Sequence, residues 1–433
     1  MVSVLPVDKG CEVGEDGPLA AKIGRQEVDF MATCGGPRRA GCYYTRSAQS
    51  KPSLTRGRRP PTMRARRVRL LFVNPNRSQS FGGVERWMID AASGLAARGH
   101  AAALLGRPGT PWLEAAARAG VPVRPDIRGG WVERVLRVGA AMRAEEADVV
   151  IVKGKKAARM AAFGRATGAR GRVAFFLGAT HELERARWVD RFTWRAVDAG
   201  IVVAHGAARW YAAEGFGPPA KMHVLWKGVD LARFDRAHAE AARKRAELGL
   251  APDELAVGTV GRLAWQKGID DLLAAVRRLR PRLPRARFFV AGGGRDAGAI
   301  AAAAAAPDLG GAVTLLGPRD DVPELLAAMD VVVQSSRREA MAQTTLEAMA
   351  VGRPVVSTTT VGADEAIENG VSGLLVPVGD AAALADAVVA LAEDPARRTA
   401  LGSAARARIA EHFTSTRMLD RCEAILRAIH AAS

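Results

Sequence analysis

The chain has 433 residues and so exceeds the ~250–300 residues at which one hydrophobic core usually divides, which predicts at least two domains. Hydrophobic residues make up 48% and charged residues 25%, values that exclude wholesale disorder, collagen-like repeats and a small disulfide-stapled fold. The 63 Lys and Arg against 45 Asp and Glu give a net charge of +18, which by itself favours a nucleic-acid or anionic-membrane partner.

The positive charge is unevenly distributed along the chain. Residues 1–62 carry 10 basic and 6 acidic side chains (net +4), and residues 63–230 carry 28 and 14 (net +14). Residues 231–433 carry 25 of each, so their net charge is zero. The basic excess therefore lies in the middle of the chain.

The cysteines and the hydropathy pattern bear on location. Four cysteines are too few for a disulfide framework, and three lie in the first 42 residues, which fits a reducing cytoplasm. The first residues lack the basic and apolar regions of a signal peptide, and no window reaches the ~18 apolar residues that a membrane span needs. We expect a cytoplasmic protein, either free or peripheral on the inner face of the membrane.

Residues 1–62 show no core-forming pattern and end in a basic, proline-rich stretch before Met63. They are interpreted either as a disordered basic tail or as upstream sequence joined by a mis-called start codon. A nucleic-acid or membrane arm is disfavoured, because Arg56, Arg58 and Arg59 have no aromatic residues between them to stack on bases.

After this tail, short apolar runs alternate with amphipathic, Ala- and Arg-rich stretches, as in βαβ units. This predicts an α/β protein with two Rossmann-like, doubly wound domains. The tail at 1–62 would be followed by a first domain at 63–229, a second domain at 230–408, and a helix at 409–433 that packs back toward the first domain. The expected strands are 68–73, 100–105, 148–152, 172–177, 199–204, 255–260, 287–291, 312–316, 331–334, 355–358 and 373–376, and the region 381–430 is expected to be helical.

Glycines and cations follow the first strand of each domain, where ligands of open α/β sheets collect. Gly82 and Gly83 precede a predicted helix and would let backbone N–H groups approach an anion, although a tight turn explains them equally. In the second domain, Arg262 and Lys267 lie where the strand at 255–260 turns into a helix. Two cations at such a strand end can hold a diphosphate without a metal.

Two glutamates, Glu339 and Glu347, flank the start of a predicted helix after the strand at 331–334. If both face the crevice, their carboxylates can accept hydrogen bonds from vicinal hydroxyl groups of a sugar or a ribose. The spacing from Thr344 to Glu347 also fits a capping box, in which Glu347 only satisfies the start of the helix.

Five segments in this order resemble the retaining glycosyltransferases of the GT-B fold, the large family four group. They read GGVER, WKGVDLARF, GRLAWQKG, LLGPRDDVPELLAAMDVVVQSS and a segment with the two glutamates that ends in EAMAVGRPVVST. The resemblance covers residues 68–430 and implies a hexosyl- or glycosyltransferase that needs no metal and no cofactor, with a UDP-, GDP- or ADP-sugar as donor substrate. It also implies that the two domains face each other across a cleft, with an acceptor-side domain at 63–229 and a nucleotide-sugar-binding domain at 230–408.

The resemblance also implies roles for individual residues. Arg262 and Lys267 match the positions that bind the donor diphosphate and stabilise the departing nucleotide. Glu339 matches the glutamate that contacts the hydroxyl groups of the donor sugar, and Glu347 matches the one that holds the ribose.

The same resemblance assigns three positions in the first domain. Gly82 and Gly83 match the loop that lies over the phosphates and the sugar. His181 matches a histidine near the donor sugar, and an ordinary loop histidine explains it as well.

The sequence departs from the family pattern at several positions. Ala340, Met341 and Ala342 follow Glu339 where glycine and an aromatic residue are usual, which leaves the identity of the sugar open. Ser335 stands in place of a common proline, and Lys227 in place of a usual asparagine in the crossover. None of these changes removes a diphosphate or ribose ligand.

The basic excess of residues 63–230 lies on the side that holds the acceptor in this fold. It indicates a glycan or lipid-linked acceptor that is anionic, such as a lipopolysaccharide core, or docking on an anionic membrane surface; a solvated arginine-rich surface is the alternative. A sugar-nucleotide epimerase or a phosphorylase of the same fold remains an alternative function, and a nucleic-acid partner is disfavoured because no nucleic-acid-binding motif is present. The candidate basic residues are Lys153, Lys155, Lys156, Arg134, Arg137, Arg143, Arg185, Arg187, Arg191 and Arg195.

Overall fold

The computed structural model describes residues 67–76, 82–178 and 187–432. The chain divides into two compact units, Met1–Met63 and Arg64–Ser433. The first unit, which contains the predicted tail, lies outside the described residues. The description below therefore concerns the second unit alone.

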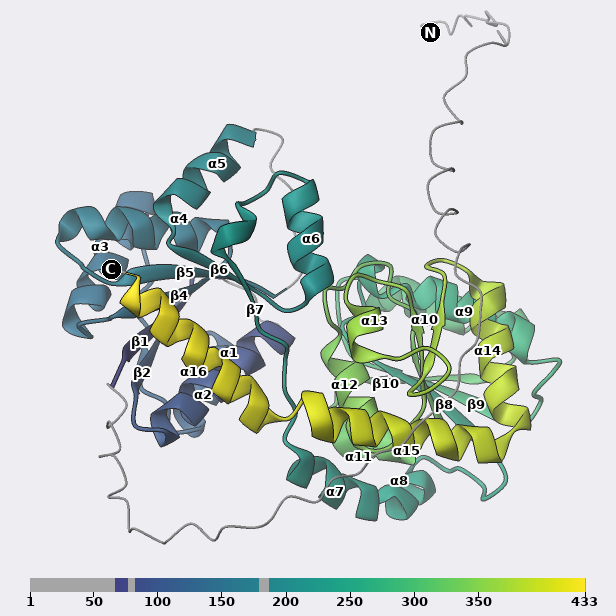
Figure 1. Ribbon diagram of the computed structural model, residues 1–433. Helices are drawn as coiled ribbons and strands as arrows, with labels where there is room; N and C mark the ends of the chain where they lie inside the picture. Colours follow the sequence, from purple (N-terminus) through teal and green to yellow (C-terminus); the bar gives the residue numbers. More distant parts are fainter. Residues whose placement is uncertain (1–66, 77–81, 179–186, 433) are drawn as a thin grey trace, which may run out of the picture. The chain divides into compact units, whose positions relative to one another are not determined.

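The first half of this unit is a seven-stranded parallel sheet with the strand order β3-β2-β1-β4-β5-β6-β7 (Figure 1). Strands such as RLLFVN in β1 are buried on both faces, as expected for a parallel sheet covered by helices on both sides. Its strands are β1 (Arg69–Asn74), β2 (Ala101–Gly106), β3 (Val123–Arg124), β4 (Val149–Lys153), β5 (Arg172–Leu177), β6 (Ala199–Val202) and β7 (Met222–Val224). Its helices are α1 (Gly83–Ala97), α2 (Pro111–Arg118), α3 (Trp131–Ala144), α4 (Lys155–Gly164), η1 (Arg165–Thr167), α5 (Arg187–Ala196), α6 (His205–Ala213) and η2 (Pro219–Lys221).

The second half is a six-stranded parallel sheet with the order β10-β9-β8-β11-β12-β13. In both sheets the strand order reverses next to the first strand, between β1 and β4 and between β8 and β11, which is where doubly wound folds bind ligands. Its strands are β8 (Leu255–Val260), β9 (Ala286–Ala291), β10 (Val313–Gly317), β11 (Val331–Gln334), β12 (Val355–Thr358) and β13 (Leu374–Val376). Its helices are α7 (Leu231–Ala239), α8 (Ala241–Glu247), η3 (Trp265–Lys267), α9 (Ile269–Leu279), α10 (Ala297–Ala304), η4 (Pro307–Leu309), α11 (Val322–Ala328), α12 (Gln343–Ala350) and α13 (Ala363–Ala366).

Three helices close the chain: α14 (Ala381–Glu393), α15 (Pro395–His412) and α16 (Ser415–Ala431). The last helix, drawn in yellow in Figure 1, packs against α1 and the strands β4 and β5 of the first sheet. The chain thus crosses between the two halves twice, and the crossings are hydrogen-bonded to each other through Val229 and the segment from Phe413 to Ser415. A Cβ atom on Gly228 would lie 2.7 Å from the Thr414 carbonyl oxygen, so the close approach of the crossings requires glycine there.

The predicted fold class, two Rossmann-like α/β domains, is confirmed, and all eleven expected strands form within two residues of their predicted ends. Strands β3 and β7, of two and three residues, were not predicted because so short a run carries no pattern. Within the described residues, no helix is long and apolar enough to span a membrane.

Candidate active site

Arg262 and Lys267 lie on the loop that joins β8 to α9, at the point where the strand order of the second sheet reverses. The loop ends at Gly268, whose φ of +58° is the left-handed conformation that glycine adopts readily. A Cβ atom there would lie 2.2 Å from the Ser335 carbonyl oxygen, and the Ser335 hydroxyl donates to the Lys267 carbonyl oxygen at 3.0 Å. The loop after β8 is therefore packed directly on the loop after β11.

A run of three glycines after β9, Gly292 to Gly294, supports the same loop from the other side. A Cβ atom on Gly292 would lie 1.8 Å from the Gly261 carbonyl oxygen, and one on Gly294 would lie 2.1 Å from that of Leu263. The backbone N–H of Leu263 donates to the Gly293 carbonyl oxygen at 2.9 Å. This support was not among the features predicted from the sequence, although three glycines in a row at a strand end signal close backbone approach.

Lys267 and Glu339, predicted from separate motifs, form an ion pair in which Nζ lies 2.5 Å from Oε1. Each side chain is only 17% exposed, so the pair is largely shielded from solvent. Arg262 is exposed and forms no ion pair with any residue in the described part of the chain. The site thus presents one cation already paired with a carboxylate and one that faces solvent.

Glu347 is buried in the second turn of α12, eight residues after Glu339. Burial raises the pKa of its carboxyl group, and the positive charges of Arg86, Arg233 and Lys227 oppose that rise. The capping-box interpretation is wrong: the helix is capped at Ala342 without a side-chain hydrogen bond, and the Thr344 hydroxyl donates to the Val260 carbonyl oxygen at 3.0 Å.

The Gly82–Gly83 segment of the first half lies against the start of α12. Gly82 is the N-cap of α1 in an extended conformation, and a Cβ atom on Gly83 would lie 3.6 Å from the Cβ atom of Gln343. The glycine loop after β1 and the helix that carries Glu347 are therefore neighbours.

Lys227, noted in the sequence only as a departure from the family pattern, is a buried member of this site. Its side chain follows β7 in the first crossover, is 5% exposed, and donates from Nζ to the Met341 carbonyl oxygen at 2.8 Å. Burial lowers its pKa from 10.5 to about 8, with Glu339 and Glu347 raising it and Lys267 lowering it. Nothing in the sequence marks this lysine as buried, because Met341, whose carbonyl oxygen it binds, lies 114 residues further along the chain.

Several of the basic candidates of the first half contact other side chains of the same half. Lys153 pairs with Glu85, and Lys155 lies 2.9 Å from Asp190. Arg137 pairs with Asp126 and Glu133, whereas Lys156, Arg191 and Arg195 are exposed. His181 and Arg185 lie outside the described residues.

Asp321, beside Asp320 at the start of α11, has a structural role, because it is paired with Lys244 at 2.6 Å and with Arg319 at 2.5 Å. No group of three or more His, Cys, Asp or Glu side chains within the described ranges is arranged to hold a metal ion.

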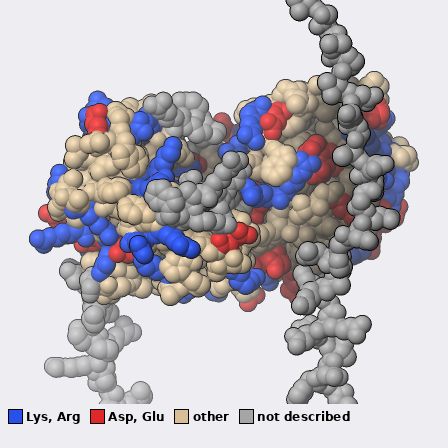
Figure 2. All heavy atoms as spheres, turned by 90° about the horizontal axis from the view of Figure 1, so that it is seen from above, with Lys and Arg blue, Asp and Glu red and all other residues tan. Residues whose placement is uncertain are grey.

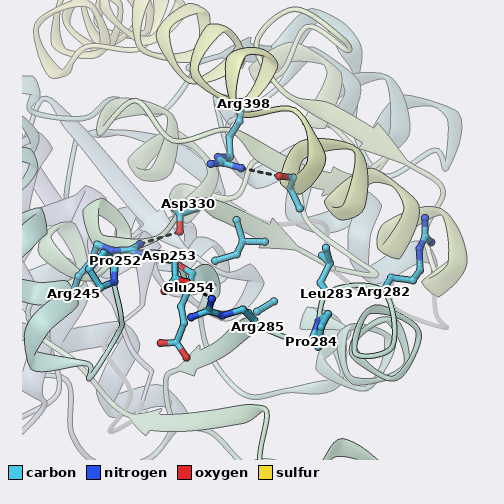
Figure 3. Close-up of a pocket in the computed structure, with 13 residues that line it drawn as sticks. Arg245, Pro252, Asp253, Glu254, Arg282, Leu283, Pro284, Arg285, Asp330 and Arg398 are labelled. Carbon is cyan, nitrogen blue, oxygen red and sulfur yellow. Dashed lines mark hydrogen bonds and ion pairs between the residues drawn. The ribbon is translucent and has the colours of Figure 1, made fainter.

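A hollow of about 450 Å³ lies at the opposite edge of the second sheet, beside the first residues of β8 and β9 (Figure 3). Its arginines are engaged: Arg245 pairs with Asp330, and Arg398 donates to the Leu391 carbonyl oxygen. Because ligands of doubly wound sheets bind at the carboxyl ends of the strands, this hollow is not the candidate active site.

Comparison with known proteins gives the same family from both halves of the chain. The model of Glycosyltransferase Family 4 matches residues 81–233, and the model of Glycosyl transferases group 1 matches residues 254–394. The lipopolysaccharide core biosynthesis glycosyltransferase LpsE of Rhizobium meliloti is 26% identical over 343 residues, 78% of this chain and 94% of that protein. D-inositol 3-phosphate glycosyltransferase of Stackebrandtia nassauensis is 38% identical over 198 residues, 43% of this chain and 44% of that protein.

Solved structures agree on the fold. HepE of Anabaena, solved in complex with UDP and glucose, superimposes with a TM-score of 0.73 at 23% identity over 83% of this chain and 100% of that one. WaaG, a glycosyltransferase involved in lipopolysaccharide biosynthesis, gives a TM-score of 0.64 at 19% identity, with 82% and 99% covered. With its two doubly wound domains and family matches in both, the chain belongs to the group 1, family 4 glycosyltransferases of the GT-B fold.

Proposed function

We propose that the protein transfers a sugar from a nucleotide-diphosphate donor to a glycan or lipid-linked acceptor, with retention of the anomeric configuration and without a metal. The observation that carries this proposal is the ion pair between Lys267 and Glu339 at the strand-order reversal of the second sheet. Arg262 lies on the same loop as Lys267, and Glu347 lies on the helix that follows Glu339. HepE, similar in fold, has been solved with UDP-glucose, which supports a nucleotide sugar as the donor.

The chemistry demands a site that accommodates negative charge as the diphosphate departs. The bond between the anomeric carbon and the diphosphate oxygen breaks with its electron pair going to the diphosphate. The acceptor oxygen then bonds to that carbon from the same face, and its proton passes to the departing diphosphate. Arg262 and Lys267 supply positive charge where this charge develops, so no step needs a metal ion.

The Lys267–Glu339 pair implies an exchange of partners when the donor binds. A diphosphate that draws the Lys267 ammonium group away leaves the Glu339 carboxylate to accept hydrogen bonds from sugar hydroxyl groups. Glu347, buried on α12, is assigned to the ribose hydroxyls. His181 is retained as a candidate contact of the donor sugar.

For the acceptor we propose an anionic glycan of the lipopolysaccharide-core type. LpsE, the relative matched over most of its length, is named for lipopolysaccharide core biosynthesis, and residues 63–230 carry a net charge of +14. Figure 2 shows basic side chains with fewer acidic ones among them on the visible face of the first domain. Activity confined to uncharged acceptors would contradict this proposal.

We also propose that the first domain docks on an anionic membrane surface. On α3, Trp131 is 42%, Val132 69% and Leu136 52% exposed, and the half-buried Arg134 lies among them. Apolar side chains beside cations are the combination that binds the membrane interface. Co-sedimentation with liposomes tests this, and equal binding to anionic and neutral lipid would contradict it.

The donor is tested by a thermal-shift screen over UDP, GDP and ADP and their common sugars, because a ligand that binds only the folded state raises its apparent stability. NMR of the product then reports the anomeric configuration. Incubation with donor alone separates the alternatives: an epimerase converts the donor sugar without an acceptor, whereas a transferase leaves that sugar unchanged.

A further inference from the structure

The structure holds a third cation at the donor site, Lys227, which the assigned family roles leave unused. Its ammonium group is buried and donates a hydrogen bond to the Met341 carbonyl oxygen, 2.8 Å away. Within the described residues it forms no ion pair at 4 Å or less. A buried ammonium group without a close carboxylate is unfavourable, because no contact ion pair offsets the free-energy cost of removing the charge from water.

The segment that Lys227 touches is the one that carries Glu339. Met341 lies two residues after Glu339, and Ala340 and Met341 are fully buried. From the other side, the backbone at Gly362 lies so close that a Cβ atom there would be 2.2 Å from the Ala340 carbonyl oxygen. The conformation of residues 339–341 is therefore held between Lys227 and Gly362.

The charges that act on Lys227 come from three parts of the second half. Glu339 lies on the loop after β11, Lys267 on η3, and Glu347 on α12, and all three act on the Lys227 ammonium group. Three cations act on Glu347 in turn: Arg86 from α1, Arg233 from α7, and Lys227 itself. Without donor, Lys267 neutralises Glu339; with donor, Lys267 is drawn to the diphosphate and Lys227 is the remaining cation beside Glu339.

We propose that Lys227 is a positioning residue of the donor site, which fixes the Glu339 segment through the Met341 carbonyl and balances the Glu339 charge when Lys267 turns to the diphosphate. This inference rests on the proposed function. It explains why a lysine is tolerated in a position where its burial is unfavourable. Without its charge, Glu339 would hold Lys267 more tightly, and the diphosphate would bind less well.

The test is a double-mutant cycle in the full chain with UDP as the probe, measured by isothermal titration calorimetry. Lys227→Gln keeps a donor for the Met341 carbonyl but removes the charge, and is expected to weaken UDP binding about tenfold, the change that 1.4 kcal/mol produces. In the Glu339→Gln background the same substitution is expected to change UDP binding less than about twofold, since no carboxylate remains to balance. Arg278→Met, which removes an exposed positive charge from α9, is the control.

An equal loss of UDP affinity in both backgrounds would mean that Lys227 only supports the fold, and would overturn the proposal. Two further readouts separate it from a purely structural role. UDP affinity of the wild type is expected to fall as pH rises from 7 to 9 and to stay level in Lys227→Gln, because Lys227 has a pKa of about 8. Lys227→Met removes the hydrogen bond to Met341 but also the cost of burying a charge, which we expect to be the larger effect, so the melting temperature at pH 7 should stay level or rise. A residue that served only to hold the fold together would lower it by several degrees when replaced.

The outcome for Lys227 and that for the proposed function can be distinguished. A wild-type protein that binds none of UDP, GDP and ADP would refute the proposed function. The melting temperature of Lys227→Met would still decide whether this lysine only holds the fold together, and a fall in that temperature would overturn the inference.

Discussion

Replacement of Glu339 by Gln should strengthen the binding of a nucleotide while it weakens sugar transfer. In the protein without donor, the Lys267 ammonium group lies 2.5 Å from a Glu339 carboxylate oxygen, so a diphosphate must compete with this carboxylate. Glutamine keeps the size of the side chain and removes its charge. The freed ammonium group is then available to the diphosphate.

The magnitude follows from the burial of the pair. Two unit charges 2.5 Å apart attract by ~7 kcal/mol at an effective dielectric constant of ~20, an upper limit because dehydration opposes it. Fully exposed pairs contribute about 0.2–1 kcal/mol, and this pair, 17% exposed, lies between these limits. We therefore take ~1.5 kcal/mol, which corresponds to about a tenfold gain in affinity for UDP.

Isothermal titration calorimetry at constant ionic strength measures this gain. The control is Glu393→Gln, which removes an exposed carboxylate at the end of α14 and should leave the affinity unchanged. In the same variant, turnover with the nucleotide sugar should fall, since the sugar hydroxyls lose a negatively charged acceptor and keep only a neutral amide oxygen. Weaker binding of UDP by Glu339→Gln than by the wild type would refute the competition between Glu339 and the diphosphate.

Three further predictions concern stability, each measured by urea denaturation. The pKa of Lys227 is about 8 in the folded state and 10.5 when unfolded, so the folded state binds fewer protons between these two pH values. The free energy of unfolding of the wild type, relative to that of Lys227→Met, should therefore rise by up to about 3 kcal/mol from pH 8 to 10.5. A difference between the two proteins that does not change with pH would contradict the burial of this lysine. Gly268→Ala should lower the free energy of unfolding by ~2 kcal/mol, because φ is +58° and the added Cβ would meet the Ser335 carbonyl oxygen. Gly298→Ala, where helix α10 leaves open space for a Cβ, should instead raise it by ~0.5–1 kcal/mol. Equal effects of the two substitutions would contradict this reasoning. Hydrogen bonds from Arg319 lower the pKa of Asp321, so Asp321→Asn should destabilise the protein by ~2 kcal/mol at pH 7. This loss of stability should disappear progressively as the pH falls below 3.8, the pKa of the carboxyl group in the unfolded chain. A loss that stays the same in acid would argue against ionised Asp321 as its cause.

Much of the site could be predicted because its residues follow strand ends. Arg262 and Lys267 follow β8, and Glu339 follows β11, so the rule that ligands bind where parallel strands end brings them to one edge. Periodicity located those strands, since each is a buried apolar run between helical patterns.

Contacts between residues that lie far apart in the chain could not be predicted from the sequence. Lys153 was assigned to an acceptor surface, but it pairs with Glu85, which lies 68 residues earlier in the chain. The burial of Lys227 depends on a contact with Met341 across 114 residues. Such contacts are set by how the helices and loops pack, and the residues next to each lysine in the sequence do not indicate them.

Lys267→Ala is the sharpest test of whether Lys267 stabilises the departing diphosphate. Turnover should be measured with the nucleotide sugar that stabilises the wild type in the thermal-shift screen. We predict a loss of at least ~100-fold in kcat, the effect of removing one preorganised charge from a developing anion, with a melting temperature close to that of the wild type. Transfer at a rate near that of the wild type by the folded variant would contradict the account.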